Sequence, residues 1–318
     1  MRYVGEYAFA ISPSDEERAL TAFDLVPRPK AAPPRDQLGE GPFWSEAEQR
    51  LYWVDIAGRW AHRVDPLTGE GTSWRMPSSC SAIIPSLKGD PLVALVDGLY
   101  RLSPDSGAVT PFARPDMDAG NRSNDTRCDP QGRLWLGTMC NNLDADGEPK
   151  PLTRASGGFF CVEADGASRP MLTGIGITNS LAWSPDGSRF YCADTTKDVI
   201  WSFAYDPDGP RLSDRKVFVE GGPGHPDGSA MDEEGFLWNA RWGAGRVIRF
   251  TPDGRIDREV TVPVSQPSSC CFGGADRKTL FVTSARQELE GLAPDSLDGS
   301  VFMAGVDVAG VPLTPFGG

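Results

Sequence analysis

Apolar and polar positions follow one pattern that occurs six times along the chain, at intervals of roughly 41–56 residues. Each copy is a polar turn followed by a short apolar and aromatic strand, and the copies span 49–53, 89–93, 131–135, 186–191, 234–238 and 276–281. A second short strand follows most copies, at 63–66, 101–104, 205–207 and 249–252, with weaker versions near Val162 and Met303. This self-similarity in a chain rich in Gly and Pro is typical of a propeller. We therefore predict an all-β fold, a six-bladed β-propeller with four-stranded antiparallel blades.

The two ends of the chain predict how the ring closes. Residues 1–18 do not fit the repeat and are interpreted as an N-terminal extension, whereas 21–26 is strand-like. The proline-rich segment 27–34 has few amide donors and cannot lie inside a sheet. An incomplete repeat near 300–304 lacks its last strand, and the early strand would supply it and remove an exposed edge. We expect residues 19–318 to form a single domain.

Composition narrows the possible partners and location. The 318 residues carry a net charge of −13, with a pI near 4.7, which argues against nucleic acid and against an anionic membrane surface. No apolar run reaches the roughly 20 residues that span a bilayer, and the first six residues lack the features of a signal peptide. The seven cysteines include no CxxC pair and fit small buried side chains in a reducing compartment. These features predict a cytoplasmic protein.

Several common catalytic motifs are missing from the sequence. There is no GxSxG elbow, no phosphate-binding GxxxxGK[ST] loop, no complete GxGxxG and no HExxH. Of the two histidines, His62 lies in a predicted outer strand and His225 precedes Pro-Asp-Gly, where we interpret it as a loop residue. The insert 141–156 is expected to be a loop over one mouth of the ring. Its Asp144 and Asp146 resemble a calcium loop but lack the acidic twelfth residue and flanking helices of an EF-hand.

Oxygen donors occur at equivalent places in four repeats, each just before a predicted inner strand. These donors are Glu40, Asn124, Asn179 and Asp227. In a ring they would point at one central position, where carboxylate and amide oxygens suit Ca²⁺, Mg²⁺ or Mn²⁺, and zinc also accepts carboxylates. Three protein ligands would leave room for water and substrate. Ordinary turn chemistry explains any one of these residues, but four in register favour a site.

Seven strings carry a resemblance to a known family. They are 39–44 (Gly-Glu-Gly-Pro-Phe-Trp), 122–125 (Arg-Ser-Asn-Asp), 129–139, 178–184 (Thr-Asn-Ser-Leu-Ala-Trp-Ser), 226–228 (Pro-Asp-Gly), 245–249 and 269–274. In this order, from about residue 21 to the C-terminus, the chain resembles the senescence-marker-protein/gluconolactonase family, which includes regucalcin. The resemblance implies a six-bladed propeller that hydrolyses aldonolactones. It implies one divalent cation bound by Glu40, Asn179 and Asp227, and sugar contacts from Arg122 and Asn124.

Two departures from the family pattern bear on the substrate. Regucalcin-like members have Asn-Asp-Gly-Lys where this chain reads Asn-Asp-Thr-Arg at 124–127. Those members also carry a substrate-contacting acid shortly after Gly-Thr-Met, where this chain has Asn141 and Asn142. A carboxylate acceptor for a sugar hydroxyl has thus become an amide, and we expect Asn142 still to contact the substrate.

Together these features predict a metal-dependent hydrolase that opens sugar lactones, with a small-molecule sugar lactone as its partner. Asp227 is the predicted general base and metal ligand, and Ca²⁺ or Zn²⁺ is expected before Mg²⁺, Mn²⁺ or Fe²⁺. Trp44 and Trp183 are predicted to lie in the blade core rather than to stack on sugar. Two alternatives stay open: a hydrolase of organophosphates or other esters, and a non-catalytic calcium-binding or protein-interaction propeller. The natural lactone, the cellular metal and the oligomeric state are left open.

Overall fold

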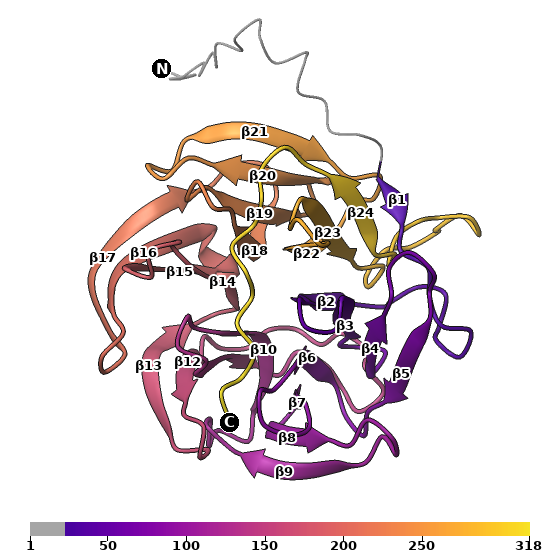
Figure 1. Ribbon diagram of the computed structural model, residues 1–318, viewed down its shortest axis with the longest axis horizontal. Coiled ribbons are helices and arrows are strands. Elements are labelled where there is room, and N and C mark those ends of the chain that lie inside the picture. The colour runs from indigo at the N-terminus through magenta and orange to yellow at the C-terminus, as the bar shows by residue number, and fades with distance from the viewer. Residues whose placement is uncertain (1–22) are drawn as a thin grey trace, which may run out of the picture.

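A computed structural model describes residues 23–318 as six four-stranded antiparallel sheets around a central axis (Figure 1). Blades one and two contain β2 (Gly39–Ser45), β3 (Arg50–Asp55), β4 (Trp60–Val64), β5 (Gly71–Arg75), β6 (Cys80–Ile84), β7 (Leu92–Leu95), β8 (Gly98–Leu102) and β9 (Val109–Ala113). Blades three and four contain β10 (Asn121–Cys128), β11 (Leu134–Cys140), β12 (Gly157–Val162), β13 (Ser168–Ile175), β14 (Thr178–Trp183), β15 (Arg189–Asp194), β16 (Val199–Asp206) and β17 (Arg211–Glu220). Blades five and six contain β18 (His225–Met231), β19 (Leu237–Trp242), β20 (Arg246–Phe250), β21 (Ile256–Thr261), β22 (Pro267–Gly273), β23 (Thr279–Ser284), β24 (Phe302–Gly305) and β1 (Asp24–Leu25). The predicted six-bladed β-propeller is confirmed.

Ring closure joins the two ends of the described chain. Five blades follow the chain in order, but the sixth has the order β1-β24-β23-β22. In it, Asp24 pairs with Met303 and Leu25 pairs with Phe302, both antiparallel. The early strand therefore completes the last blade, as the incomplete C-terminal repeat predicts. Of the expected strand 21–26, the described part shows Asp24–Leu25 as strand, and residues 21–22 and the predicted extension 1–18 lie outside the described residues.

The first strand of each blade lies nearest the axis: β2, β6, β10, β14, β18 and β22 (Figure 1). Every residue of β2, β6, β10, β14 and β22 is buried. All six inner strands also contain a register shift against the neighbouring second strand. A β-bulge bends its strand and re-aims side chains, so these shifts can turn polar side chains toward the axis without ending the sheet.

Tryptophans on three second strands are each held by a buried aspartate that lies outside the strands. Their indole N–H groups donate to buried aspartates in the pairs Trp53–Asp36 (3.1 Å), Trp135–Asp129 (3.3 Å) and Trp238–Asp232 (2.8 Å). The rings fill the apolar space between blades while their polar edge is satisfied. Trp44 and Trp183 also lie buried in hydrophobic clusters, which confirms their predicted place in the core.

The remaining expectations on composition can be compared directly with the structure. All seven cysteines are buried and free, as predicted. His62 is fully buried in β4, stacked against Trp53, and its Nδ1 lies 2.8 Å from Ser73 Oγ, in agreement with a structural role. Within residues 23–318 the helical structure is limited to the 3-10 turn η2 (Thr195–Lys197), so this part of the chain has no helix capable of crossing a membrane.

The C-terminal segment 306–318 crosses one face of the ring, and in Figure 1 it lies in front of the central axis. Val311 N–H donates to Met231 O (2.9 Å), Phe316 N–H to Pro85 O (2.8 Å) and Gly317 N–H to Gly132 O (2.9 Å). These bonds connect the segment to three blades, and the Phe316 ring is fully buried. We call this face the base, and the segment covers the base end of the central channel.

Candidate active site

The four oxygen donors lie on four different inner strands and are all buried. Glu40 is on β2, Asn124 on β10, Asn179 on β14 and Asp227 on β18. The prediction that they precede the inner strands is wrong, because each lies inside its strand at a register shift. Glu40 and Asn179 are the last paired residues before the bulge, Asn124 and Asp227 lie within it, and pairing resumes beyond it. Sequence patterns show where a turn ends, but they do not show that the residues just before the bulge are already paired with the next strand.

Glu40 and Asp227 form a buried carboxyl pair. They lie close enough for each carboxyl group to shift the pKa of the other. Burial and, to a smaller extent, the nearby charge of Asp125 raise the pKa of Glu40 to about 8, while the charge of Arg122 opposes the change. Burial and the Glu40 charge likewise raise the pKa of Asp227 well above its ordinary value. Two carboxyl groups this close do not both ionise unless a positive charge lies between them.

Two amides stand beside this pair and orient each other. Asn124 Nδ2 donates to Asn179 Oδ1 (3.2 Å) and to Thr178 O (2.8 Å). Asn179 Nδ2 in turn donates to Thr195 Oγ1 (2.9 Å), whose hydroxyl donates to Pro226 O (2.7 Å). Because the Asn179 oxygen accepts one hydrogen bond, from Asn124, it keeps a lone pair for a cation.

Arg122 connects the amides to the insert over the mouth. It is buried, its Nε donates to Asn142 Oδ1 (2.9 Å), and its Nη1 donates to Asn124 Oδ1 and Ser123 O (both 2.8 Å). Burial lowers the Arg122 pKa to about 10, while the charges of Glu40 and Asp227 oppose this shift. The guanidinium is therefore still protonated at neutral pH. Its Nη2 has no acceptor among residues 23–318 and is available to a ligand.

The structure thus brings all six residues named from the sequence into one cluster. A continuous set of hydrogen bonds runs from Asn142 through Arg122 and Asn124 to Asn179. The Glu40–Asp227 pair lies close enough for its charges to act on Arg122. The individual roles of these residues remain predictions.

Two further residues of the site were not anticipated. Asp125 is buried, its Oδ2 accepts the N–H of Leu181 (3.2 Å), and burial raises its pKa. Asn239 Nδ2 donates to the main-chain oxygen of Asp227 (2.8 Å), which fixes the backbone of the predicted base. A polar residue in the middle of the apolar strand β19 is the signal that could have identified Asn239.

The insert and His225 lie at the edge of this cluster. The insert is a loop between β11 and β12, as predicted, and Arg59 Nη1 donates to Ala145 O (3.0 Å), so it reaches from blade three to blade one. Asp144 Oδ1 accepts the N–H groups of Asp146 and Glu148 (2.8 and 2.9 Å) as an ordinary turn. His225 begins β18 rather than lying in a loop, and its exposed ring contacts Asp198 instead of a predicted site residue.

The donor set fits a hard divalent cation. No group of three or more His, Cys, Asp or Glu side chains within residues 23–318 is arranged to hold a metal, and the amide oxygen of Asn179 is a further donor type beside the two carboxyl groups. Glu40 and Asp227 supply two carboxyl groups whose pKa values are raised by burial, and Asn179 supplies an amide oxygen. Hard cations prefer this chemistry, and displacement of a proton is a usual part of metal binding.

Comparison with known proteins agrees with this geometry. The profile of the SMP-30/Gluconolactonase/LRE-like region matches residues 38–286. The chain is 35% identical to the 6-deoxy-6-sulfogluconolactonase of Pseudomonas putida, over 88% of this chain and 95% of the relative. It is 38% identical to the L-arabinolactonase of Azospirillum brasilense, over 89% and 93%. The crystal structure of the calcium-binding protein regucalcin from Agrobacterium tumefaciens superposes with a TM-score of 0.82 at 31% identity, covering 94% of this chain and 99% of that one.

Proposed function

Because the chain belongs to the SMP-30/gluconolactonase/LRE-like family, we propose that it is a lactonase that opens sugar lactones to the corresponding aldonic acids. Relatives named as lactonases for several sugars support the reaction class. The observation that carries the proposal is the convergence of Glu40, Asn179 and Asp227 from three blades beside the buried Arg122. A lactonase needs this combination, since the carbonyl must be polarised while the sugar is held in place.

We further propose that Glu40, Asn179 and Asp227 hold one divalent cation, with Ca²⁺ or Zn²⁺ preferred. The resemblance to a calcium-binding regucalcin supports calcium in particular. When bound, such a cation supplies Lewis acidity, which polarises a lactone carbonyl and favours the negative charge that develops on its oxygen.

The side chains of the site supply the general base and the contacts that orient the sugar. Asp227 is the general base that takes a proton from the attacking water, and Asn239 holds its main chain in position. Arg122 offers its free Nη2 to a ring hydroxyl or to the lactone oxygen. Asn124 and Asn142 fix the guanidinium through their side-chain oxygens and lie where sugar hydroxyls would bind. The sugar would thus be oriented before reaction.

Removal of divalent metal should abolish turnover. Protein stripped with a chelator and assayed by pH-stat on an aldonolactone panel is expected to lose at least about 100-fold in rate. Calcium or zinc added back should restore it, because the pair Glu40–Asp227 and Asn179 would regain their cation.

The same assay distinguishes the alternatives. A phosphotriester assayed beside the lactones tests for an organophosphate hydrolase, and no hydrolysis of any substrate with metal present would favour a non-catalytic binding propeller. Full lactonase activity in protein shown by elemental analysis to lack metal would contradict the proposed cofactor.

Arg122→Lys should weaken substrate binding more than it slows turnover. Lysine keeps the positive charge, but its donors radiate from a single nitrogen and cannot reproduce the planar fork that reaches Asn142, Asn124 and the sugar from separate nitrogens. We expect KM to rise about tenfold, with a smaller change in kcat. Arg215→Lys, on the exposed outer strand β17, is the matched control and should leave both constants unchanged. A change in kcat alone would exclude a role in substrate binding.

A further inference from the structure

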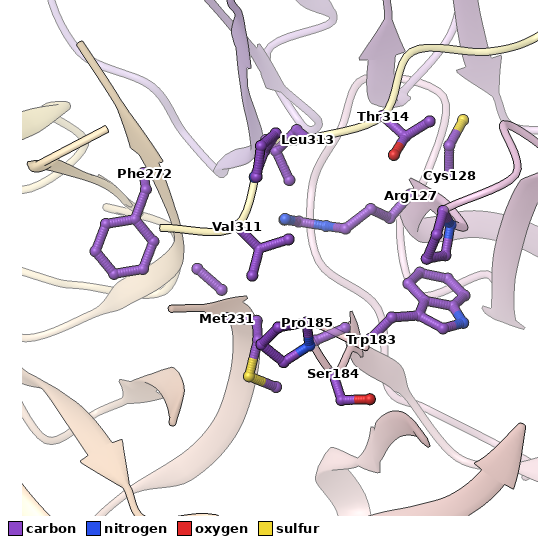
Figure 2. A pocket seen from close by; sticks show the side chains of 14 residues that line it. Arg127, Cys128, Trp183, Ser184, Pro185, Met231, Phe272, Val311, Leu313 and Thr314 are labelled. Atoms are coloured by element: carbon purple, nitrogen blue, oxygen red, sulfur yellow. The ribbon is translucent and has the colours of Figure 1, made fainter. Parts of the chain in front are cut away.

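A second, separate pocket lies at the base of the channel. The inner strands β10, β14, β18 and β22 and the C-terminal residues 311–314 surround a cavity of about 100 Å³, which we call the base pocket. Figure 2 shows the Arg127 side chain extending into it, toward Val311 and Leu313. Arg127 is three residues beyond Asn124 on β10, so roughly 10 Å of strand separates the two positions.

The Arg127 side chain has no hydrogen-bond or ion-pair partner within the described chain. Only 7% of the residue is exposed, yet its guanidinium makes no hydrogen bond and no ion pair with any residue in 23–318. The acid that it influences is Asp125, whose pKa its charge lowers without direct contact between the two. A buried charged group without acceptors is costly, and native proteins seldom leave one unsatisfied. The five donors of Arg127 therefore suit an anionic ligand entering the base pocket.

The walls of the base pocket restrict which anion fits. Apart from Arg127 they are mainly apolar, with Ala182, Trp183, Met231, Phe272, Val311 and Leu313 around the cavity. Its rim includes Pro130, Pro185 and Thr314, which are partly or fully exposed, so the pocket can be reached from solvent. A strongly hydrated inorganic anion gains little from such walls, whereas a ligand with an apolar body does.

We propose that the base pocket binds a small organic carboxylate, with its carboxylate on Arg127 and its apolar body between the C-terminal segment and Trp183. A guanidinium binds a carboxylate through two parallel hydrogen bonds, which matches the free fork of Arg127. The site is distinct from the cluster around Asp227, and it does not depend on lactonase activity.

Butyrate is a suitable probe because it has a carboxylate and a short apolar chain. Titration of the full-length protein, followed by calorimetry and by ligand-observed saturation-transfer NMR, is expected to show saturable binding. Butanol, which lacks the charge, should not bind. Arg127→Gln should weaken butyrate binding by at least about tenfold, because the charged hydrogen bonds are lost. Thr314→Trp should also weaken butyrate binding, because the larger side chain would fill the pocket at its rim. This variant keeps Arg127, so it still tests the proposal if Arg127→Gln does not fold.

Binding at the candidate active site must be separated from binding at the base pocket, since a carboxylate also resembles the product of lactone hydrolysis. Asp227→Asn should bind butyrate as tightly as the parent protein if the base pocket is the site. The proposal is overturned by an absence of saturable binding, by binding that survives Thr314→Trp, or by binding that disappears in Asp227→Asn. Failure of the lactonase assays would leave these results unaffected.

Discussion

Asp227→Asn is expected to lower kcat/KM for aldonolactones by at least about a thousandfold. Asparagine keeps the size of the side chain and a carbonyl oxygen, but it cannot accept the proton of an attacking water. It also removes one of the two carboxyl groups that would balance a cation beside Glu40. Initial rates measured by pH-stat in metal-replete buffer test this directly.

The matched control is Asp276→Asn, the same substitution at an exposed turn between β22 and β23. It should retain the parent rate. Circular dichroism and thermal unfolding should show that Asp227→Asn is folded, so that loss of activity reflects chemistry. Parent-like activity of Asp227→Asn with metal present would exclude Asp227 as the base.

Arg249→Met should cause the largest loss of stability among the changes considered. Arg249 is 2% exposed and donates to three carboxylates, Asp232 Oδ2 (2.8 Å), Asp257 Oδ2 (2.8 Å) and Glu234 Oε2 (2.6 Å). Methionine fills similar space but leaves the fully buried Asp232 without its cation. Breaking a buried pair from one side costs about 3–5 kcal/mol, because an uncompensated charge remains. Urea unfolding followed by tryptophan fluorescence would measure the change in unfolding free energy.

Arg255→Met is the matched control for this substitution. Arg255 also pairs with an aspartate, Asp253, but the arginine side chain is 79% exposed. Exposed pairs contribute about 0–1 kcal/mol, so this variant should be nearly neutral. An equal loss of unfolding free energy in the two variants would show that burial does not make the ion pairs of Arg249 more stabilising than an exposed pair.

The blades could be predicted from the sequence because each one repeats the same local chemistry. The polar turn and aromatic strand at Glu234–Trp238, for example, became the start of β19 with Trp238 in the core. Ring closure followed from an unmatched strand at each end, and β1 pairs with β24. These features depend on short stretches of chain, where apolar alternation and turn residues specify the outcome.

The candidate site was only partly predictable. Four donors in equivalent repeats indicated a common position, and the structure brings them together. The contacts of Thr195 and Asn239 were not predictable, because each joins residues through the register of one strand against another. The unpartnered guanidinium of Arg127 was not predictable either, because the cavity around it is formed in part by the C-terminal segment that crosses the base.

The pairing of β1 with β24 also has a consequence for synthesis of the protein. The first of these strands is synthesised long before its partner at residues 302–305. Until then the nascent molecule is an open arc of blades with both terminal edges unpaired, a form that invites association between chains. The circle can therefore close only once residues 302–305 have been synthesised.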